Sequence, residues 1–147
     1  MPLITFAPAQ ADDFERLLAL RLAVMRPHLE RLGRFEPDRA RARFADGFSP
    51  EHTRLIHLDG VFAGCVALKP AAGGAEIEHF YLESGRQGQG IGGVVLDRLL
   101  GETDAAGLRV ELGVLKQSPA RRLYERRGFS LTHSGEWDDY FARTPAA

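Results

Sequence analysis

Apolar positions recur at two different spacings along the chain, and these spacings predict where helices and strands lie. One helical face is formed by apolar residues three or four positions apart, namely Phe14, Leu18, Leu22, Met25 and Leu29. We expect Asp12 to cap this helix, with Glu15 completing a capping box, and Pro27 to end or kink it. A second helix is predicted to begin near Pro37, because proline favours the first helical turn.

Short apolar runs predict strands before and after these helices. Residues 3–6 suit a first strand at the edge of a sheet. Asp59-Gly60 is typical of a two-residue hairpin, and Ser134-Gly135 separates a second pair of runs. The further strands are expected at residues 54–58, 61–68, 76–82, 108–114, 129–132 and 137–141.

The order of the elements indicates the fold class. Two more helices are expected, one after the glycine-rich residues 85–93 and one after Ser118-Pro119, a cap followed by a first-turn proline. The order is then β-α-α-β-β-β-α-β-α-β-β. Hairpin connections in the first half and crossovers in the second predict an α/β fold with a mixed sheet and helices on its faces. We expect residues 1–147 to form a single domain, since no linker or repeat interrupts them.

Composition excludes several classes of function. The 19 basic and 20 acidic residues give a net charge of −1, so we expect no general attraction to nucleic acid or to an anionic membrane. No apolar run is long enough to span a membrane and no signal peptide is visible, so a cytoplasmic localisation is predicted. The single cysteine, Cys65, is expected to be buried rather than nucleophilic, and the histidines show no metal-ligand spacing, so we expect no metal.

The glycine-rich segment 85–93 lies between a strand and a helix. A helix start offers unpaired N–H groups and a positive dipole end, so this segment predicts a phosphate-binding turn. Gly88, Gly90 and Gly93 satisfy the dinucleotide pattern G-x-G-x-x-G, but they come late in the chain, and no acidic residue ends the next strand. A P-loop is excluded, because no Gly-Lys-Ser/Thr follows. A flexible turn without a ligand is the remaining alternative.

Three segments together resemble one known family. The run Gln87-Gly88-Gln89-Gly90-Ile91-Gly92 is similar to the pyrophosphate-binding motif of the GNAT N-acetyltransferase superfamily. Phe80-Tyr81-Leu82 ends the preceding strand at the spacing used there, and residues 121–129 resemble the family's R-L-Y-E-R-x-G-F segment. Ser118 stands where relatives often carry Asn. The resemblance implies a GNAT-like fold, with a mostly antiparallel sheet splayed between its fourth and fifth strands.

The resemblance also implies a cosubstrate and a reaction. Acetyl-CoA would lay its pantetheine arm along the backbone of Phe80, Tyr81 and Leu82, and its pyrophosphate on Gln87 to Gly92, with further contacts from Ser118 and Arg121. The implied reaction transfers an acetyl group from acetyl-CoA to a primary amine of a small molecule or a protein. The alternative is a non-catalytic acyl-CoA sensor, and the resemblance leaves a homodimer open.

Three residues are candidates for moving protons. Tyr124 resembles the family's general acid, the alternative being a tyrosine of the core. Glu76 and Glu78 lie two apart on a strand and therefore face the same side, where each would raise the pKa of the other. Glu76 also aligns with a glutamate that acts through water in relatives; the alternative is a pair of solvated charges.

The acceptor site is predicted from the resemblance alone. Arg26, His28, Glu30 and Arg34 cluster where the family forms its acceptor wall, and Tyr140 on the last strand is a further candidate. Mixed charge there suits a polar acceptor with its own carboxylate. The alternative is a solvated helix end.

Overall fold

The elements follow the predicted order throughout residues 1–146, which are the residues that the structure, a computed structural model, describes. The strands are β1 (Ile4–Pro8), β2 (Thr53–Leu58), β3 (Val61–Ala71), β4 (Gly74–Leu82), β5 (Arg109–Leu115), β6 (Ser130–Ser134) and β7 (Asp138–Arg143). The helices are α1 (Phe14–Arg31), α2 (Pro37–Gly47), α3 (Ile91–Ala105) and α4 (Ala120–Glu125). Short 3-10 turns lie at Ala11–Asp13, Pro50–His52 and Ser84–Arg86.

The strands form one mixed sheet in the order β1-β2-β3-β4-β5-β7-β6. The pairs β1/β2, β2/β3, β5/β7 and β6/β7 are antiparallel, whereas β4 and β5 are parallel. The paired residues of β4 and β5 run only from Gly74 opposite Arg109 to Glu76 opposite Glu111, although both strands continue beyond them. The predicted fold class is therefore confirmed, including the splay between the fourth and fifth strands.

The chain divides into two compact units. Unit 1 comprises Met1–Ala67 with His79–Gly92, and unit 2 comprises Leu68–Glu78 with Gly93–Ala147. Strands β3 and β4 pass from one unit into the other. That residues 1–147 act as one domain stays a prediction.

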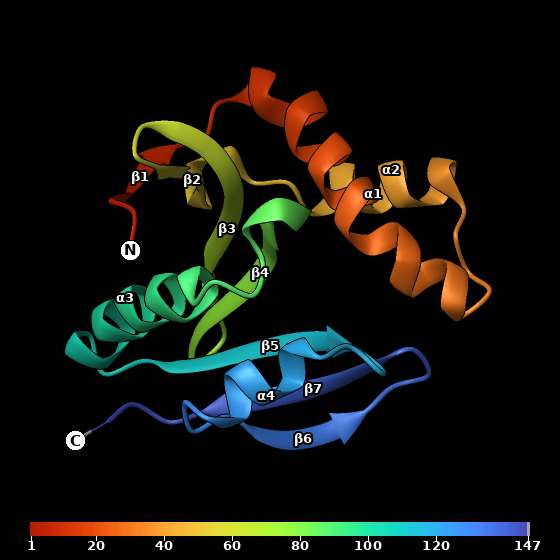
Figure 1. Ribbon diagram of the computed structural model, residues 1–147. Helices are drawn as coiled ribbons and strands as arrows, with labels where there is room; N and C mark the ends of the chain where they lie inside the picture. The colour runs from red at the N-terminus through yellow and green to blue at the C-terminus, as the bar shows by residue number, and fades with distance from the viewer. Residues whose placement is uncertain (147) are drawn as a thin grey trace. The chain divides into compact units, whose positions relative to one another are not determined.

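The core of unit 1 forms where α1 and α2 meet, as Figure 1 shows in orange. Phe14 of α1 lies 5.5 Å from Phe44 and 5.7 Å from Phe48, measured between ring centroids. Phe44 and Phe48 stack at 5.5 Å, one helical turn apart as predicted. Buried aliphatic residues complete this core: Leu17, Leu18, Leu20 and Leu55.

The predicted cap of the first helix was wrong, and the helix does not end at Pro27. Asp12 does not cap it: the 3-10 turn Ala11–Asp13 precedes α1, and Asp13 accepts the backbone N–H of Gln10 at 2.8 Å. Pro27 does not end it, because α1 continues to Arg31. Proline at this position removes only the N–H that would bond to the carbonyl of Ala23, and Ala23 is exposed, so water can take that place.

In unit 2, α4 packs on β7, where the Arg121 guanidinium lies 5.2 Å from the ring centroid of buried Phe141 (Figure 1). Arg143 at the end of β7 donates two hydrogen bonds to Asp104 of α3, at 2.6 and 3.0 Å. This pairing holds the pKa of Asp104 down at about 2, chiefly through the Arg143 hydrogen bonds. Helix α3 is thereby attached to the last strand.

Candidate active site

The glycine-rich turn belongs to unit 1 up to Gly92. It follows β4 through the 3-10 turn Ser84–Arg86 and leads into α3 at the buried residue Ile91. Gly88 and Gly90 have φ values of +75° and +80°, which only glycine adopts at little cost. A side chain at Gly88 would meet no atom within 4 Å, so the space beside this backbone is open. The turn therefore offers main-chain N–H groups at a helix start to an approaching anion.

The glutamine side chains of the turn brace it from within. Gln87 donates from Nε2 to the carbonyl oxygen of Leu82 at 3.0 Å, and Gln89 donates from Nε2 to that of Gly85 at 3.1 Å. The Gln87 side chain therefore fixes the turn, which leaves anion binding to the backbone.

Gly93 has a packing role within unit 2. A Cβ on Gly93 would lie 2.6 Å from Nη2 of Arg127, whose Nε pairs with Asp97 of α3 at 2.7 Å. Gly93 therefore lies against Arg127 of the segment 121–129. The third glycine of the literal dinucleotide pattern is thus explained by close packing rather than by phosphate.

Strand β4 carries an irregularity that the sequence did not reveal. His79 has a φ of +51° within the strand, and its carbonyl accepts a hydrogen bond from the Cys65 thiol at 3.3 Å. A left-handed residue interrupts the regular hydrogen bonding of a strand and costs about 1–3 kcal/mol, a strain typical of functional sites. Its ring is buried and lies 4.7 Å from that of Phe44.

The segment Phe80–Leu82 follows this irregularity directly. Tyr81 and Leu82 are buried, and Phe80 is half-buried. The Tyr81 hydroxyl accepts a hydrogen bond from Nη1 of Arg21 at 2.5 Å. A Cβ at Gly64 of β3 would lie 2.2 Å from the Tyr81 carbonyl oxygen, so β3 requires glycine there for the close approach of the two backbones. The predicted pantetheine-binding segment is therefore held in place from both α1 and β3.

The predicted carboxylate pair lies in unit 2, where β4 begins. Burial raises the pKa of Glu76, and hydrogen bonding to Glu78 and the charge of Glu78 raise it further. Lys69 opposes this effect, and its Nζ pairs with Glu78 at 3.1 Å. Glu111 of β5, opposite Glu76 in the sheet, adds a weaker upward effect and pairs with Arg109. The pair is therefore asymmetric: Lys69 forms an ion pair with Glu78, whereas the pKa of Glu76 is raised.

The other predicted residues of unit 2 surround α4. Tyr124 is buried, with its ring 5.7 Å from that of Phe129 in an edge-to-face arrangement. Ser118 Oγ accepts the N–H of Ala120 at 3.2 Å, but the N-cap of α4 is Pro119 and not Ser118 as predicted. Arg121 pairs with Glu125 at 3.3 Å and with Asp139 at 3.8 Å. A cofactor role for Ser118 and Arg121 stays a prediction.

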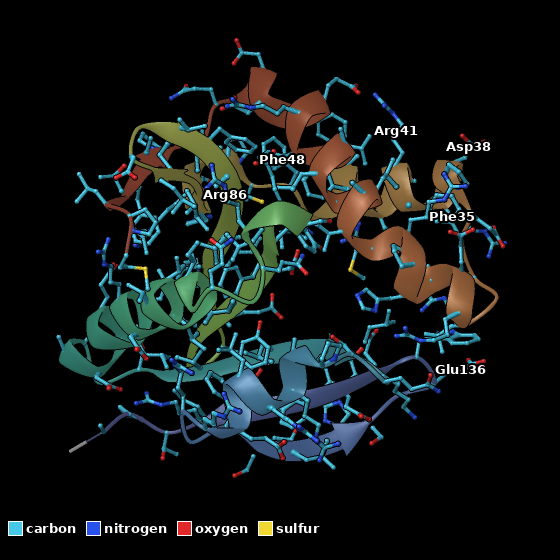
Figure 2. The ribbon with its side chains drawn as sticks, viewed as in Figure 1. Phe35, Asp38, Arg41, Phe48, Arg86 and Glu136 are labelled. Atoms are coloured by element: carbon cyan, nitrogen blue, oxygen red, sulfur yellow. The ribbon has the colours of Figure 1, made fainter. Side chains whose placement is uncertain are left out.

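The predicted acceptor cluster separates into smaller contacts. Arg26 pairs with Glu30 at 3.1 Å and lies 4.7 Å from the ring of Phe35, which Figure 2 labels in the loop after α1. His28 instead contacts Arg31, with 3.0 Å between ring nitrogen and guanidinium, and burial and this charge lower its pKa. Arg34 lies just beyond α1, where its N–H donates to the Leu29 carbonyl at 2.8 Å.

Tyr140 belongs to unit 2, unlike the other predicted acceptor residues. Its ring stacks on that of His133 at 4.6 Å, on the hairpin of β6 and β7. Its part in acceptor binding stays a prediction, as do the parts of Arg26, His28 and Arg34.

Two features of unit 1 escaped the sequence reasoning. One is Arg21, which no motif marks. The other is a groove of about 480 Å³ lined by Arg16, Ala19, Leu20, Ala23, Val24, Phe62, Glu83 and Ser84. Helical spacing along α1 could have indicated that these α1 residues share a face, but not that Phe62 and Glu83 lie opposite them.

Residues 1–146 contain neither a cluster of metal-ligating side chains nor a reactive cysteine. No group of three or more His, Cys, Asp or Glu side chains in this range could hold a metal ion. Cys65 is fully buried, and burial raises the pKa of its thiol to about 12, which makes it a poor nucleophile. None of the helices in this range is both long and apolar enough to pass through a membrane.

Comparison with known families gives one match. The model of the acetyltransferase (GNAT) family matches residues 17–129, which include the glycine-rich turn, β4 and α4. A comparison with curated protein sequences gave no match.

Solved structures share the fold at low sequence identity. The PaiA N-acetyltransferase from Thermoplasma acidophilum, in complex with coenzyme A, aligns with a TM-score of 0.75 and 18% identity over 97% of this chain and 99% of its own. The ribosomal-protein-S18-alanine N-acetyltransferase from Escherichia coli aligns with a TM-score of 0.69 and 16% identity, over 99% and 96% of the two chains. N-acetylglutamate synthase from Neisseria gonorrhoeae, in complex with coenzyme A and L-arginine, has a TM-score of 0.69 and 18% identity, over 100% of this chain and 34% of its own.

Proposed function

The chain belongs to the acetyltransferase (GNAT) family, and from this premise we propose that it transfers an acetyl group from acetyl-CoA to a primary amine. The observation that carries the proposal is the turn between β4 and α3. Its glycines at positive φ and its open space beside Gly88 suit close contact between main-chain N–H groups and a diphosphate. The backbone of Gln87 to Gly92 would hold the pyrophosphate of the cosubstrate.

The segment Phe80–Leu82 is proposed to hold the reacting end of acetyl-CoA. The left-handed residue His79 lies directly before it, and the pantetheine arm would pair with the main chain of this segment like a short strand. The N–H near Leu82 would donate to the thioester oxygen, which becomes negatively charged when the amine attacks. Arg21 and the close approach of Gly64 limit the movement of this segment.

Two proton transfers complete the proposed reaction. The acceptor ammonium must lose a proton before it attacks, and Glu76 with its raised pKa is the proposed base. Glu78, beside it in the strand, is paired with Lys69. The CoA thiolate must gain a proton, and Tyr124 is the proposed acid.

The acceptor itself stays open in this proposal. The fold neighbours include a synthase of N-acetylglutamate and an acetyltransferase of a ribosomal protein's alanine, so this fold serves both a small molecule and a protein. For this chain we propose a primary amine of either kind. A cytoplasmic localisation remains the prediction from the sequence.

The direct test measures cosubstrate binding and turnover separately. Isothermal titration calorimetry with acetyl-CoA and with CoA should give saturable binding, and NAD should give none. Thiol release with acetyl-CoA and a library of primary amines should then identify acceptors. Binding without thiol release from any amine would favour an acyl-CoA sensor, and no binding of either CoA species would refute the proposal.

A further inference from the structure

Arg21 carries a buried nitrogen that has no hydrogen-bond partner, which is unusual for a charged side chain. It lies half-buried in α1, where Nη1 donates to the Tyr81 hydroxyl at 2.5 Å and the guanidinium lies 5.8 Å from the Tyr81 ring centroid. Its Nε is buried and makes no hydrogen bond. A buried donor without a partner costs about 1–3 kcal/mol, and more when it belongs to a charged group.

Neighbouring arginines of the same helix are paired with carboxylates. Arg16 contacts Asp13 at 2.8 Å, and Arg26 contacts Glu30 at 3.1 Å. Within residues 1–146, Arg21 forms no ion pair, and its hydrogen bond to Tyr81 is with a neutral hydroxyl. A guanidinium cannot lose its proton in a protein, so this positive charge persists in a partly dry environment.

The donors that this guanidinium leaves without a hydrogen bond have a defined arrangement. Tyr81 occupies Nη1, whereas Nε and Nη2 make no hydrogen bond within the described residues. These two donors lie parallel on one edge, the arrangement that binds both oxygens of a carboxylate. An arriving carboxylate would satisfy the orphaned Nε and neutralise the charge.

Arg21 contacts the segment that is proposed to hold the thioester. Its contact residue there is Tyr81. Met25 and His28 follow Arg21 at helical spacings of four and seven, on the same face of α1. His28 contacts Arg31 at 3.0 Å.

We propose that Arg21 binds a carboxylate of the amine acceptor, which makes the acceptor class an amino acid or a similar amine with a nearby carboxylate. The inference rests on the proposed function and names its substrate class. It also assigns the carboxylate-binding role to Arg21, whose Nε has no hydrogen-bond partner, rather than to Arg26 or Arg34, which the sequence suggested. Fixing the carboxylate would position the amine relative to the segment Phe80–Leu82.

The test compares acceptors that differ only in this group. The panel consists of the twenty L-amino acids and their α-carboxamides, with thiol release from acetyl-CoA as the readout. We expect kcat/KM to favour the acid of the best pair by about tenfold or more. Arg21→Gln should lower kcat/KM for that acid about 10- to 100-fold, mainly through KM, and leave its amide within about twofold.

Three further variants separate binding from structure. Arg16→Gln removes an equal charge from the same helix and should leave the acid-to-amide ratio unchanged. Arg21→Lys keeps the charge but loses the two-donor edge, so it should restore only part of the preference. Tyr81→Phe removes the hydroxyl contact to Nη1 and should keep the preference for the acid over the amide, since Nε and Nη2 of Arg21 are unchanged.

Several outcomes would overturn the inference. Amides that react as well as acids, or an Arg21→Gln effect that is equal on both, would mean that Arg21 only supports Tyr81. A weaker affinity of Arg21→Gln for CoA in calorimetry would assign the anion to the cosubstrate. Thiol release only with amines that lack a carboxylate would refute the inference and leave the proposed function intact, whereas no release from any amine would count against the proposed function itself.

Discussion

In unit 1 the turn between β4 and α3 presents main-chain N–H groups, whereas in unit 2 the first residues of β4 present carboxylates in contact with a lysine. The turn requires glycine where φ is positive, and its glutamine side chains hydrogen-bond to nearby backbone carbonyls. The carboxylate cluster depends on side chains, because the pKa of Glu76 responds to Glu78, Lys69 and Glu111. Backbone chemistry therefore suits a constant ligand such as a diphosphate, and side-chain chemistry suits tuning of proton transfer.

The strongest test of this division is Tyr124→Phe in unit 2. The change deletes one oxygen and keeps the ring packed edge-to-face on Phe129, so the fold should persist. Loss of a general acid should lower kcat by about 100-fold or more, while the Kd for CoA in calorimetry stays unchanged. Unaltered turnover would show that Tyr124 is a core tyrosine.

The next test concerns the backbone of unit 1. Gly88→Ala places a side chain in open space but forces it to a φ of +75°, which costs about 1 kcal/mol or more. We expect the Kd for CoA to rise about tenfold, since the turn would relax away from its binding shape. Calorimetry and thermal unfolding of the same sample distinguish lost affinity from lost stability.

Gly107→Ala is the matched control for that change. Gly107 also has a positive φ, +69°, and open space, but it follows the far end of α3 in unit 2. It should lose stability without losing CoA affinity. Equal affinity losses in the two variants would mean that glycine strain, rather than anion binding, governs the result.

The smallest expected effect is a shift in the pH profile. If Glu76 is the base, its deprotonated form acts, so kcat/KM should fall as pH decreases through its raised pKa. Lys69→Met removes the cation that lowers this pKa, together with its ion pair to Glu78, and it should move the acidic limb about one pH unit higher. Arg109 remains paired with Glu111 and should not offset the change.

Lys116→Met gives the control, since Lys116 lies after β5 and has no effect on the pKa of Glu76. It should leave the acidic limb in place. Glu76→Gln should abolish the limb, and a limb that survives this substitution would remove Glu76 from the mechanism.

Much of the fold was predictable because it depends on local patterns. Asp59-Gly60 forms the predicted hairpin, with φ values of +50° and +83°, because these two residues tolerate the required turn. Pro37 begins α2 as predicted. Pro27 failed as a helix terminator because exposure of Ala23, a tertiary property, decides whether the missing hydrogen bond matters.

The site was predictable only in part, for a similar reason. The glycine-rich turn is contiguous in sequence, so its residues and its position at a helix start could be read directly. The pairing of Lys69 with Glu78 and the close contact of Arg127 with Gly93 join separate segments, and no spacing rule connects them. Candidate residues could therefore be named from the sequence, whereas the residues that they contact could not.

The sequence by itself determined the order of the elements, the glycine turn and the presence of two carboxylates on one strand, because each follows from residues close together in the chain. Only the tertiary structure decided that His79 adopts a left-handed conformation in β4 and that Arg21 meets Tyr81, sixty residues away. Such contacts depend on how side-chain volumes and charges are packed between distant segments, and no local pattern of polar and apolar positions contains that information.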